Sequence, residues 1–233
     1  MLLRLPTASK LDLFERCVGP WQLPLSPREE SDAAREGKAL HLFAETGKPQ
    51  AESGRISADE ERVERALADL PAHRALYREA VCRYCPTTGE AGIITGMKGA
   101  RPYGDSDDVW IWGTADVVGE LADSSLLLAD LKTGSPHWLK MPWGPGGALR
   151  DAPLQIPFLA AVFARALDRP AALCCCVSSQ AERAFCARYS RDDLEAILAR
   201  VSGMVHSPPT SYVAGDHCTF CPVRGNCPLY GSF

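Results

Sequence analysis

The sequence contains no long uninterrupted run of apolar residues. Nowhere in its 233 residues does a stretch approach the roughly 20 apolar residues that a membrane-spanning helix requires. The apolar part of residues 1–6 is also too short for a signal peptide. We therefore expect a cytoplasmic protein without a membrane partner.

An excess of basic residues is also missing, because the formal net charge is −4. This balance argues against a protein that coats nucleic acid by bulk attraction, although it is compatible with an acidic site for Mg²⁺ or Mn²⁺. No helix-turn-helix or zinc-finger pattern is present, so we expect no strong sequence specificity. The absence of a glycine-rich dinucleotide fingerprint weighs against an electron-transfer enzyme.

The remaining composition is that of an ordinary globular domain, with 46% apolar and 23% charged residues. Patterning predicts helices from Ser9 to Cys17, where Gly19-Pro20 follows, and over 31–46, 58–69, 152–167 and 191–204. Strands are predicted over 78–86, 91–97, 109–119, 125–132, 172–179 and 183–189. This order indicates an α/β fold with a mixed central sheet flanked by helices.

Two neighbouring predicted strands carry acidic residues at a meaningful spacing. Asp116 lies in the first, and Asp130-Leu131-Lys132 ends the second. Alternation places Asp130 and Lys132 on one face, and a short turn can bring Asp116 close to them. Paired carboxylates favour a divalent cation, and a lysine beside it can hold a phosphate oxygen. An Asp–Lys pair on a solvated strand face is the alternative, since D-x-K alone is common.

The full set of motifs resembles the PD-(D/E)XK nuclease superfamily, in its RecB-like branch, which includes AddB and CRISPR-associated nucleases. The resemblance implies a restriction-endonuclease-like fold in which Asp116 and Asp130 bind metal and Lys132 is catalytic. It also implies a metal-ligand role for His41 in Gly37-Lys-Ala-Leu-His41, and an active-site position for Gln155. The sequence departs from the family at Leu159, where a tyrosine is usual. A packed core histidine is the alternative for His41. Glu79 could assist the site, but it is ranked no higher than a surface carboxylate.

Ten cysteines are more than packing requires, and a spaced cluster in a reducing compartment indicates metal or redox chemistry. The tail carries Cys218, Cys221 and Cys227, and Cys17 is the natural fourth ligand. Four thiolates can bind Zn²⁺ or an iron–sulfur cluster, and His217 in place of a thiol would favour zinc. Resemblance to the clasp of AddB and the CRISPR-associated nucleases favours [4Fe–4S]. We expect one domain over 1–233, in which 1–30 and the tail 207–233 form this subregion.

The other cysteines have simpler interpretations. Cys174, Cys175 and Cys176 lie in an apolar strand and are expected to be buried free thiols. Cys82 and Cys85 form a second C-x2-C, but they would lie on opposite faces of a regular strand. Cys186 has no evident partner.

The segment 136–150 is rich in Gly, Pro and Trp and is predicted to be an irregular loop. Between Lys132 and Arg150 it has basic but no acidic residues, with Lys140, Trp138 and Trp143 between them. Such a loop could stack on unpaired bases, or its tryptophans could pack on the core while it connects two elements.

Together these features predict a Mg²⁺- or Mn²⁺-dependent deoxyribonuclease, an exonuclease on single-stranded or frayed DNA ends. Its setting would be repair, recombination, or CRISPR or phage defence, with possible protein partners there. The alternative is a non-catalytic DNA-binding or scaffold subunit that retains the fold and cluster. The presence of Asp116, Asp130 and Lys132 favours the enzyme, because a protein without catalytic activity would be free to lose these residues.

Overall fold

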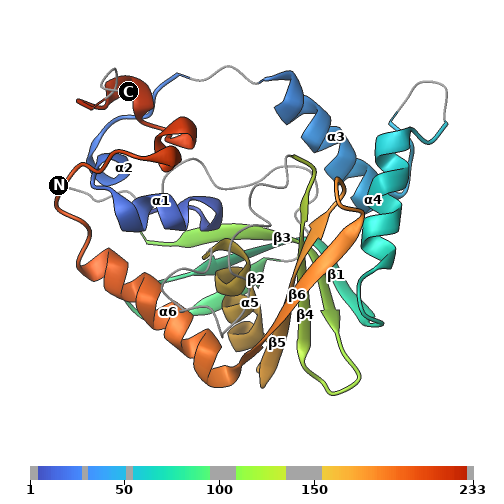
Figure 1. Cartoon of the computed structure of the whole chain (residues 1–233). Coiled ribbons are helices and arrows are strands. Elements are labelled where there is room, and N and C mark those ends of the chain that lie inside the picture. Colours follow the sequence, from blue (N-terminus) through green and yellow to red (C-terminus); the bar gives the residue numbers. More distant parts are fainter. Residues whose placement is uncertain (1–4, 28–30, 51–54, 95–108, 135–153, 230–233) are drawn as a thin grey trace.

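The computed structural model describes residues 5–27, 31–50, 55–94, 109–134 and 154–229 (Figure 1). Its centre is a six-stranded mixed sheet in the order β2-β1-β3-β4-β5-β6. Only β4 and β5 pair in parallel among these strands; the other four pairings are antiparallel. The mixed α/β architecture expected from the sequence is therefore confirmed.

The strands are β1 (Arg74–Tyr84), β2 (Ala91–Ile94), β3 (Ile111–Glu120), β4 (Leu126–Lys132), β5 (Ala171–Ser178) and β6 (Arg183–Ser190). The α-helices are α1 (Leu11–Arg16), α2 (Gly19–Gln22), α3 (Asp32–Thr46), α4 (Ala58–Ala68), α5 (Gln155–Ala166) and α6 (Arg191–His206). Short 3-10 helices cover Ala8–Lys10, Asp216–Phe220 and Arg224–Asn226.

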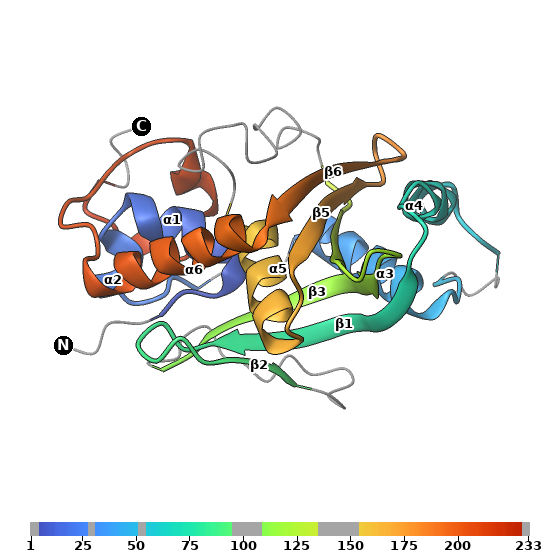
Figure 2. The same cartoon turned by 90° about the horizontal axis from the view of Figure 1, so that it is seen from below.

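Helices cover both faces of the sheet (Figure 2). On one face α5 packs against the sheet together with α6 and the N-terminal helices, and its buried residues Phe158 and Phe163 belong to the larger core cluster. On the other face α3 and α4 form a smaller cluster that includes Phe43 and Val63. Two covered faces explain why β4 is an almost continuous apolar run.

The helix α5 lies in the connection between the parallel strands β4 and β5. A parallel pair requires a crossover, and a helix is the usual one. This topology brings the first turn of α5 to the end of β4, where Lys132 is the last strand residue. The crossover therefore determines which residues can reach Asp130 and Lys132 from outside the sheet.

The first helix ends at Arg16, next to the predicted end at Cys17. The pair Gly19-Pro20 then begins the short helix α2, which the sequence did not predict, because proline has no N–H to lose in a first turn. The first strand begins at Arg74, four residues before the predicted position, and its exposed start is irregular, with a shifted register between Ala75 and Tyr77.

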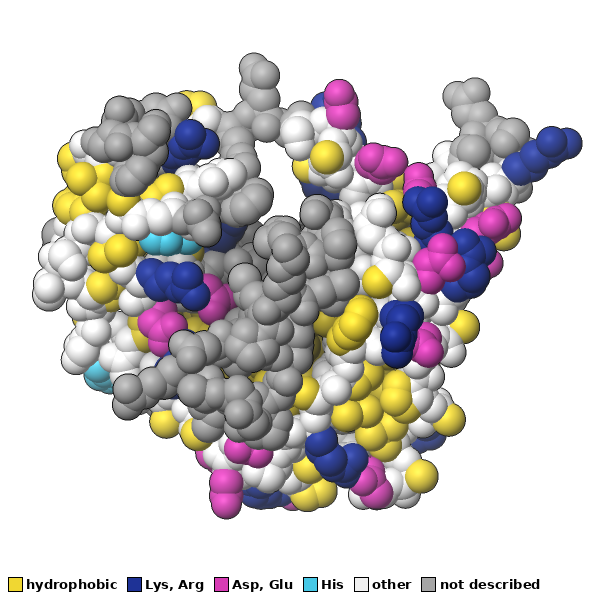
Figure 3. All heavy atoms as spheres, viewed as in Figure 1, with side chains coloured by type: hydrophobic (Ala, Val, Ile, Leu, Met, Phe, Trp, Pro, Cys, Tyr) yellow, Lys and Arg dark blue, Asp and Glu magenta, His cyan; other side chains and the backbone are white. Residues whose placement is uncertain are grey.

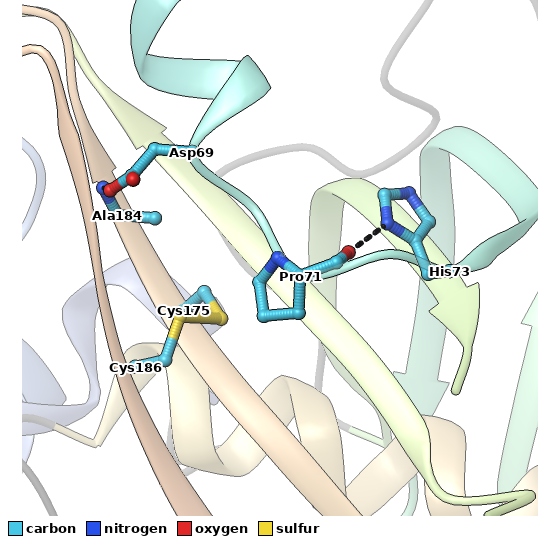
Figure 4. The surroundings of a disulfide bond; sticks show 6 residues. All are labelled: Asp69, Pro71, His73, Cys175, Ala184 and Cys186. Atoms are coloured by element: carbon cyan, nitrogen blue, oxygen red, sulfur yellow. Dashed lines mark hydrogen bonds between the residues drawn. A yellow bond between two sulfur atoms is a disulfide. The ribbon is translucent and has the colours of Figure 1, made fainter. Parts of the chain in front are cut away.

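A disulfide joins Cys175 in β5 to Cys186 in β6, whose backbones are directly paired (Figure 4). The prediction that Cys175 is a free thiol is therefore wrong. Cys186, for which the sequence showed no evident partner, is paired with it. Residues opposite each other on adjacent strands place their side chains on the same face, and sequence spacing alone does not reveal such a pairing. Cys174 and Cys176 are free and fully buried, as expected.

The two ends of the described chain lie side by side, at the opposite side of the molecule from α4, in both views (Figures 1 and 2). Backbone bonds join them: the amide of Val18 donates to Ser211, and that of Ser26 donates to Pro222. Among the described residues, no helix has the length and apolar character needed to cross a membrane.

Candidate active site

The candidate site lies where β3 and β4 separate. Their last paired residues are Val117 and Ala129, so Asp116 and Asp130 come directly after the end of the ladder. Oδ2 of Asp116 accepts a hydrogen bond from the amide of Leu131 at 2.5 Å. This bond fixes the Asp116 carboxylate between the separating strands. It also gives a hydrogen-bond partner to the Leu131 amide, which lies beyond the paired part of β3 and β4.

Asp130, Lys132 and Gln155 contact one another at the same place, where β3 and β4 separate. Oδ2 of Asp130 lies 2.5 Å from Nζ of Lys132. Gln155, at the start of α5, donates through Nε2 to Oδ1 of Asp130 and accepts through Oε1 from Lys132, both at 3.0 Å. The predicted common face of Asp130 and Lys132 is therefore present, and the glutamine amide holds both charged groups in place.

Burial and charge act against each other on this pair. Burial raises the pKa of Asp130, the Lys132 ammonium lowers it, and the Asp116 carboxylate raises it, so that the net direction is upward. Burial lowers the pKa of Lys132, but the Asp130 carboxylate raises it by more. Oδ2 of Asp130 is buried and makes no hydrogen bond apart from this ion pair, so the Lys132 ammonium compensates its charge.

The helix α3 brings His41 to the site. Nδ1 of His41 lies 3.2 Å from Oδ1 of Asp116. One turn earlier, a Cβ on Gly37 would meet Oγ1 of Thr133 at 3.2 Å. Residues four apart share a helix face, so the small residue allows the helix to approach the end of β4 and His41 to reach Asp116. The side chain of His41 is not in the apolar core.

Glu79 belongs to the same group, although the sequence interpretation ranked it no higher than a surface carboxylate. It lies within β1, and its Oε1 is 3.7 Å from Nδ1 of His41. One ligand atom from each of His41, Glu79 and Asp116 lies within 4.8 Å of the others. The interpretation of Glu79 as a surface carboxylate is wrong, because its side chain is only 23% exposed.

These donors fit a divalent metal ion. Carboxylate oxygens and an imidazole nitrogen suit Mn²⁺, and the carboxylates suit Mg²⁺. Burial lowers the pKa of His41, but the carboxylates of Asp116 and Glu79 together raise it by more, to about 10. The protonated imidazole thus supplies a positive charge beside the two carboxylates. A bound metal cation would neutralise the same negative charges.

Leu159, where the related family usually has a tyrosine, lies in α5 one turn after Gln155. Its side chain is fully buried and packs against β3, where a Cβ on Gly113 would come within 2.4 Å of Cδ2 of Leu159 and 2.8 Å of the Ala8 Cβ. The residue therefore serves packing between α5 and the sheet.

Asp12 in α1 fixes the start of α5. Both of its carboxylate oxygens accept from the amide of Leu154, at 3.1 and 3.3 Å. Leu154 precedes Gln155, so this cap positions the residue that holds Asp130 and Lys132. Burial raises the pKa of Asp12, against the effect of this hydrogen bond.

The four cysteines of the predicted clasp lie in one region. Burial raises the pKa of Cys221, and the neighbouring Cys17, Cys218 and Cys227 raise it further, which requires all three to be within electrostatic range. Within the described chain, no three of these thiols come within 4.8 Å of one another. The ring of His217 donates through Nε2 to the carbonyl of Val213 at 3.0 Å.

Backbone and side-chain bonds tie the cysteine-bearing segments together. Sγ of Cys17 accepts from the amides of Gly19 and Val213, each at 3.4 Å. Oγ of Ser26 accepts from the amide of Gly225 at 2.8 Å, and the Asn226 side chain donates to Pro24 at 3.0 Å. The first and last segments therefore form one unit around the thiols.

The second C-x2-C motif does not form a comparable cluster. Cys82 is buried in the core beneath α5, whereas Cys85 follows the end of β1 in a turn, where its Sγ lies 3.1 Å from the Thr87 hydroxyl. The predicted DNA-contacting residues Trp138, Lys140, Trp143 and Arg150 lie outside the described residues.

One protein-family model matches most of the chain. The model of the PD-(D/E)XK nuclease superfamily matches residues 7–228, a span that contains every side chain described above. Among curated proteins, none matches this sequence.

A solved structure titled "Crystal structure of SSO0001" is 15% identical, with a TM-score of 0.31. The match covers 52% of each chain, so this chain spans about half the length of that protein, and a likeness of this size carries no argument about function. The family match over nearly the whole chain is what decides: the protein belongs to the PD-(D/E)XK nuclease superfamily.

Proposed function

We propose that this protein is a Mg²⁺- or Mn²⁺-dependent deoxyribonuclease. The observation that carries the proposal is the convergence of Asp116, Asp130, Lys132 and His41 at the point where β3 and β4 separate. A nuclease family accounts for the hydrolytic reaction, and these side chains supply the charges that the reaction needs.

Each side chain has a distinct role in this proposal. Asp116, Asp130 and His41 would hold the metal ion, which when bound lowers the pKa of a water molecule and neutralises charge on the phosphate. Lys132 holds a phosphate oxygen through its ammonium group. Gln155 keeps Lys132 and Asp130 at their positions through its amide.

We propose single-stranded or frayed DNA ends as the substrate, cut exonucleolytically in repair, recombination, or CRISPR or phage defence. Basic and acidic side chains are interspersed on the face drawn in Figure 3, and the net charge is −4. Neither feature offers the broad basic surface that coats a duplex, which supports a grip on a short length of strand.

We also propose that Cys17, Cys218, Cys221 and Cys227 hold a [4Fe–4S] cluster that joins residues 1–30 to 207–233 of one nuclease domain. Cys17, Cys218 and Cys227 each act on the pKa of Cys221, so the four thiols lie in one region, which supports a shared site with four thiolate ligands. The hydrogen bond of His217 to Val213 gives no support to His217 as a zinc ligand.

The test is cleavage of end-labelled single- and double-stranded DNA by protein purified without oxygen, with Mn²⁺, Mg²⁺ or EDTA. We expect metal-dependent cleavage that falls by about 10²-fold or more in Lys132→Ala, because that change removes a positioned charge from the reacting phosphate. Lys48→Ala is the matched control, since Lys48 is an exposed lysine beyond the end of α3.

Equal activity of Lys132→Ala and wild type would refute the site. If wild type and Lys132→Ala are equally inert while both bind DNA and carry the cluster, the protein is instead a cluster-stabilised subunit without catalysis. If the wild type cleaves DNA, the ladder of labelled products distinguishes exonuclease from endonuclease and gives the polarity.

A further inference from the structure

Glu79 has an uncommon backbone conformation at the edge of the candidate site. Its φ is 46°, in the left-handed region that non-glycine residues rarely occupy and that strains the backbone. The flanking pairs, Arg78 with Val117 and Ala80 with Ala115, place Glu79 opposite Asp116. A strained residue therefore faces a central carboxylate of the site.

The strain changes which way the strand faces. Along β1, Ala80 and Cys82 belong to the core beneath α5, and Tyr77 packs against that same core. Regular alternation would place Tyr77 and Ala80 on opposite faces. In β3, Ala115 and Val118 likewise share that core, whereas Val117 belongs to the core beneath α3 and α4. The pairing register of β1 and β3 is continuous across Glu79 and Asp116, so the change of face between the two clusters accompanies the left-handed backbone of Glu79 and is separate from the register shift between Ala75 and Tyr77.

The result is a carboxylate directed toward α3. Oε1 of Glu79 lies 3.7 Å from Nδ1 of His41, which is itself 3.2 Å from Oδ1 of Asp116. Ligand atoms of the three residues lie within 4.8 Å of one another. Asp130 lies beside this group, where its Oδ2 contacts the Lys132 ammonium at 2.5 Å.

We propose that Glu79 is a direct ligand of the divalent ion, together with His41 and Asp116, and that its left-handed backbone aims the carboxylate at that ion. The inference rests on the proposed metal-dependent function and adds a ligand to it. Glutamate is a stronger ligand for Mg²⁺ or Mn²⁺ than the neutral amide of glutamine, so charge and geometry can be tested separately.

The experiment is Mn²⁺ titration of the EDTA-treated, desalted protein without DNA, with free Mn²⁺ followed by electron paramagnetic resonance. Glu79→Gln keeps hydrogen-bonding capacity toward His41 but loses the charge, and Glu79→Gly also loses the strain. We expect both variants to bind Mn²⁺ about 10-fold or more weakly, the scale on which even indirect partners act at metal sites. Glu79→Gly should melt no lower than Glu79→Gln.

Asp168→Gly is the matched control. Asp168 also has a left-handed backbone, with φ 48°, but it is exposed and paired with Arg191. Its replacement removes strain and a carboxylate without touching the site, so Mn²⁺ affinity should remain that of wild type.

Wild-type Mn²⁺ affinity in Glu79→Gln would show that the Glu79 carboxylate does not hold the ion and would overturn the inference. The nuclease proposal would survive if Lys132→Ala still abolished cleavage. Failure of the wild-type protein both to bind Mn²⁺ and to cleave DNA would overturn the inference and the proposed function together.

Discussion

At the scale of single residues, each buried carboxylate of the site contacts a partner group of the protein itself. Asp116 uses one oxygen to accept the Leu131 amide and the other to face His41. Asp130 is held by Lys132 and Gln155 on its two oxygens. Each carboxylate therefore has a partner of its own chain, which keeps the buried charges compensated before any metal ion binds.

His41 should titrate far above an ordinary histidine in the metal-free protein. Its pKa is raised from 6.5 to about 10 by Asp116 and Glu79, against the effect of burial. A raised folded-state pKa contributes stability that is fully present below pH 6.5 and is lost as pH rises through 10. In EDTA, wild type should therefore lose stability over this window, and His41→Gln should lack that contribution.

The measurement is imidazole NMR across pH, with the His41 signal assigned by its absence in His41→Gln, beside urea unfolding at pH 6 and pH 9.5. Asp116→Asn should lower the His41 pKa, because it removes the partner at 3.2 Å. A His41 titration near 6.5 would show that the two carboxylates do not surround the ring.

At the scale of elements, the close approach of α5 to β3 depends on a residue without a side chain. A Cβ on Gly113 would come within 2.4 Å of Cδ2 of Leu159 and 2.8 Å of the Ala8 Cβ, closer than packed carbon atoms approach. The same helix begins at Gln155, so the packing at Gly113 also sets the position of the site amide.

Gly113→Ala should reduce the free energy of unfolding by about 1–3 kcal/mol, the usual cost of overpacking a core. Urea unfolding measures the change. Gly203→Ala is the control, because the Cβ there meets nothing within 4 Å and should stabilise α6 by about 0.5–1 kcal/mol. An unchanged stability of Gly113→Ala would mean that α5 moves away from the sheet at no cost.

At the scale of the whole molecule, the ends of the chain are joined beside the nuclease core. Cys17 and the last three cysteines of the proposed cluster are separated by some 200 residues, and closing so long a loop restricts the unfolded chain strongly. Asp12 extends this joined unit to the site, since it lies five residues before Cys17 and caps the start of α5.

Cys227→Ala should give colourless protein with a clearly lower melting temperature, because a missing ligand releases the cluster and opens the clasp. Visible absorption, iron content and thermal melting measure this. Cys82→Ala is the control, since Cys82 is buried in the core and lies outside the four-cysteine group, so it should keep the colour of wild type while losing only packing. An unchanged spectrum and melting temperature of Cys227→Ala would remove the clasp hypothesis.

Much of the fold follows from local pattern alone. Alternation places Asp130 and Lys132 on one face, and the four-residue spacing from Gly37 to His41 places both on one side of α3; the structure brings these residues together. Periodicities of two and about 3.6 residues are properties of neighbouring residues, so the sequence already determines them. The same holds for the order of helices and strands and for the family to which the chain belongs.

Only the tertiary structure decided what depends on contacts between distant segments. The Cys175–Cys186 disulfide follows from the register of β5 against β6. The place of Glu79 in the site follows from the change of face that it shares with Asp116. Neither the disulfide nor the position of Glu79 follows from the local alternation of side chains. The pairing of strands and the packing of helices on them determine where these side chains point.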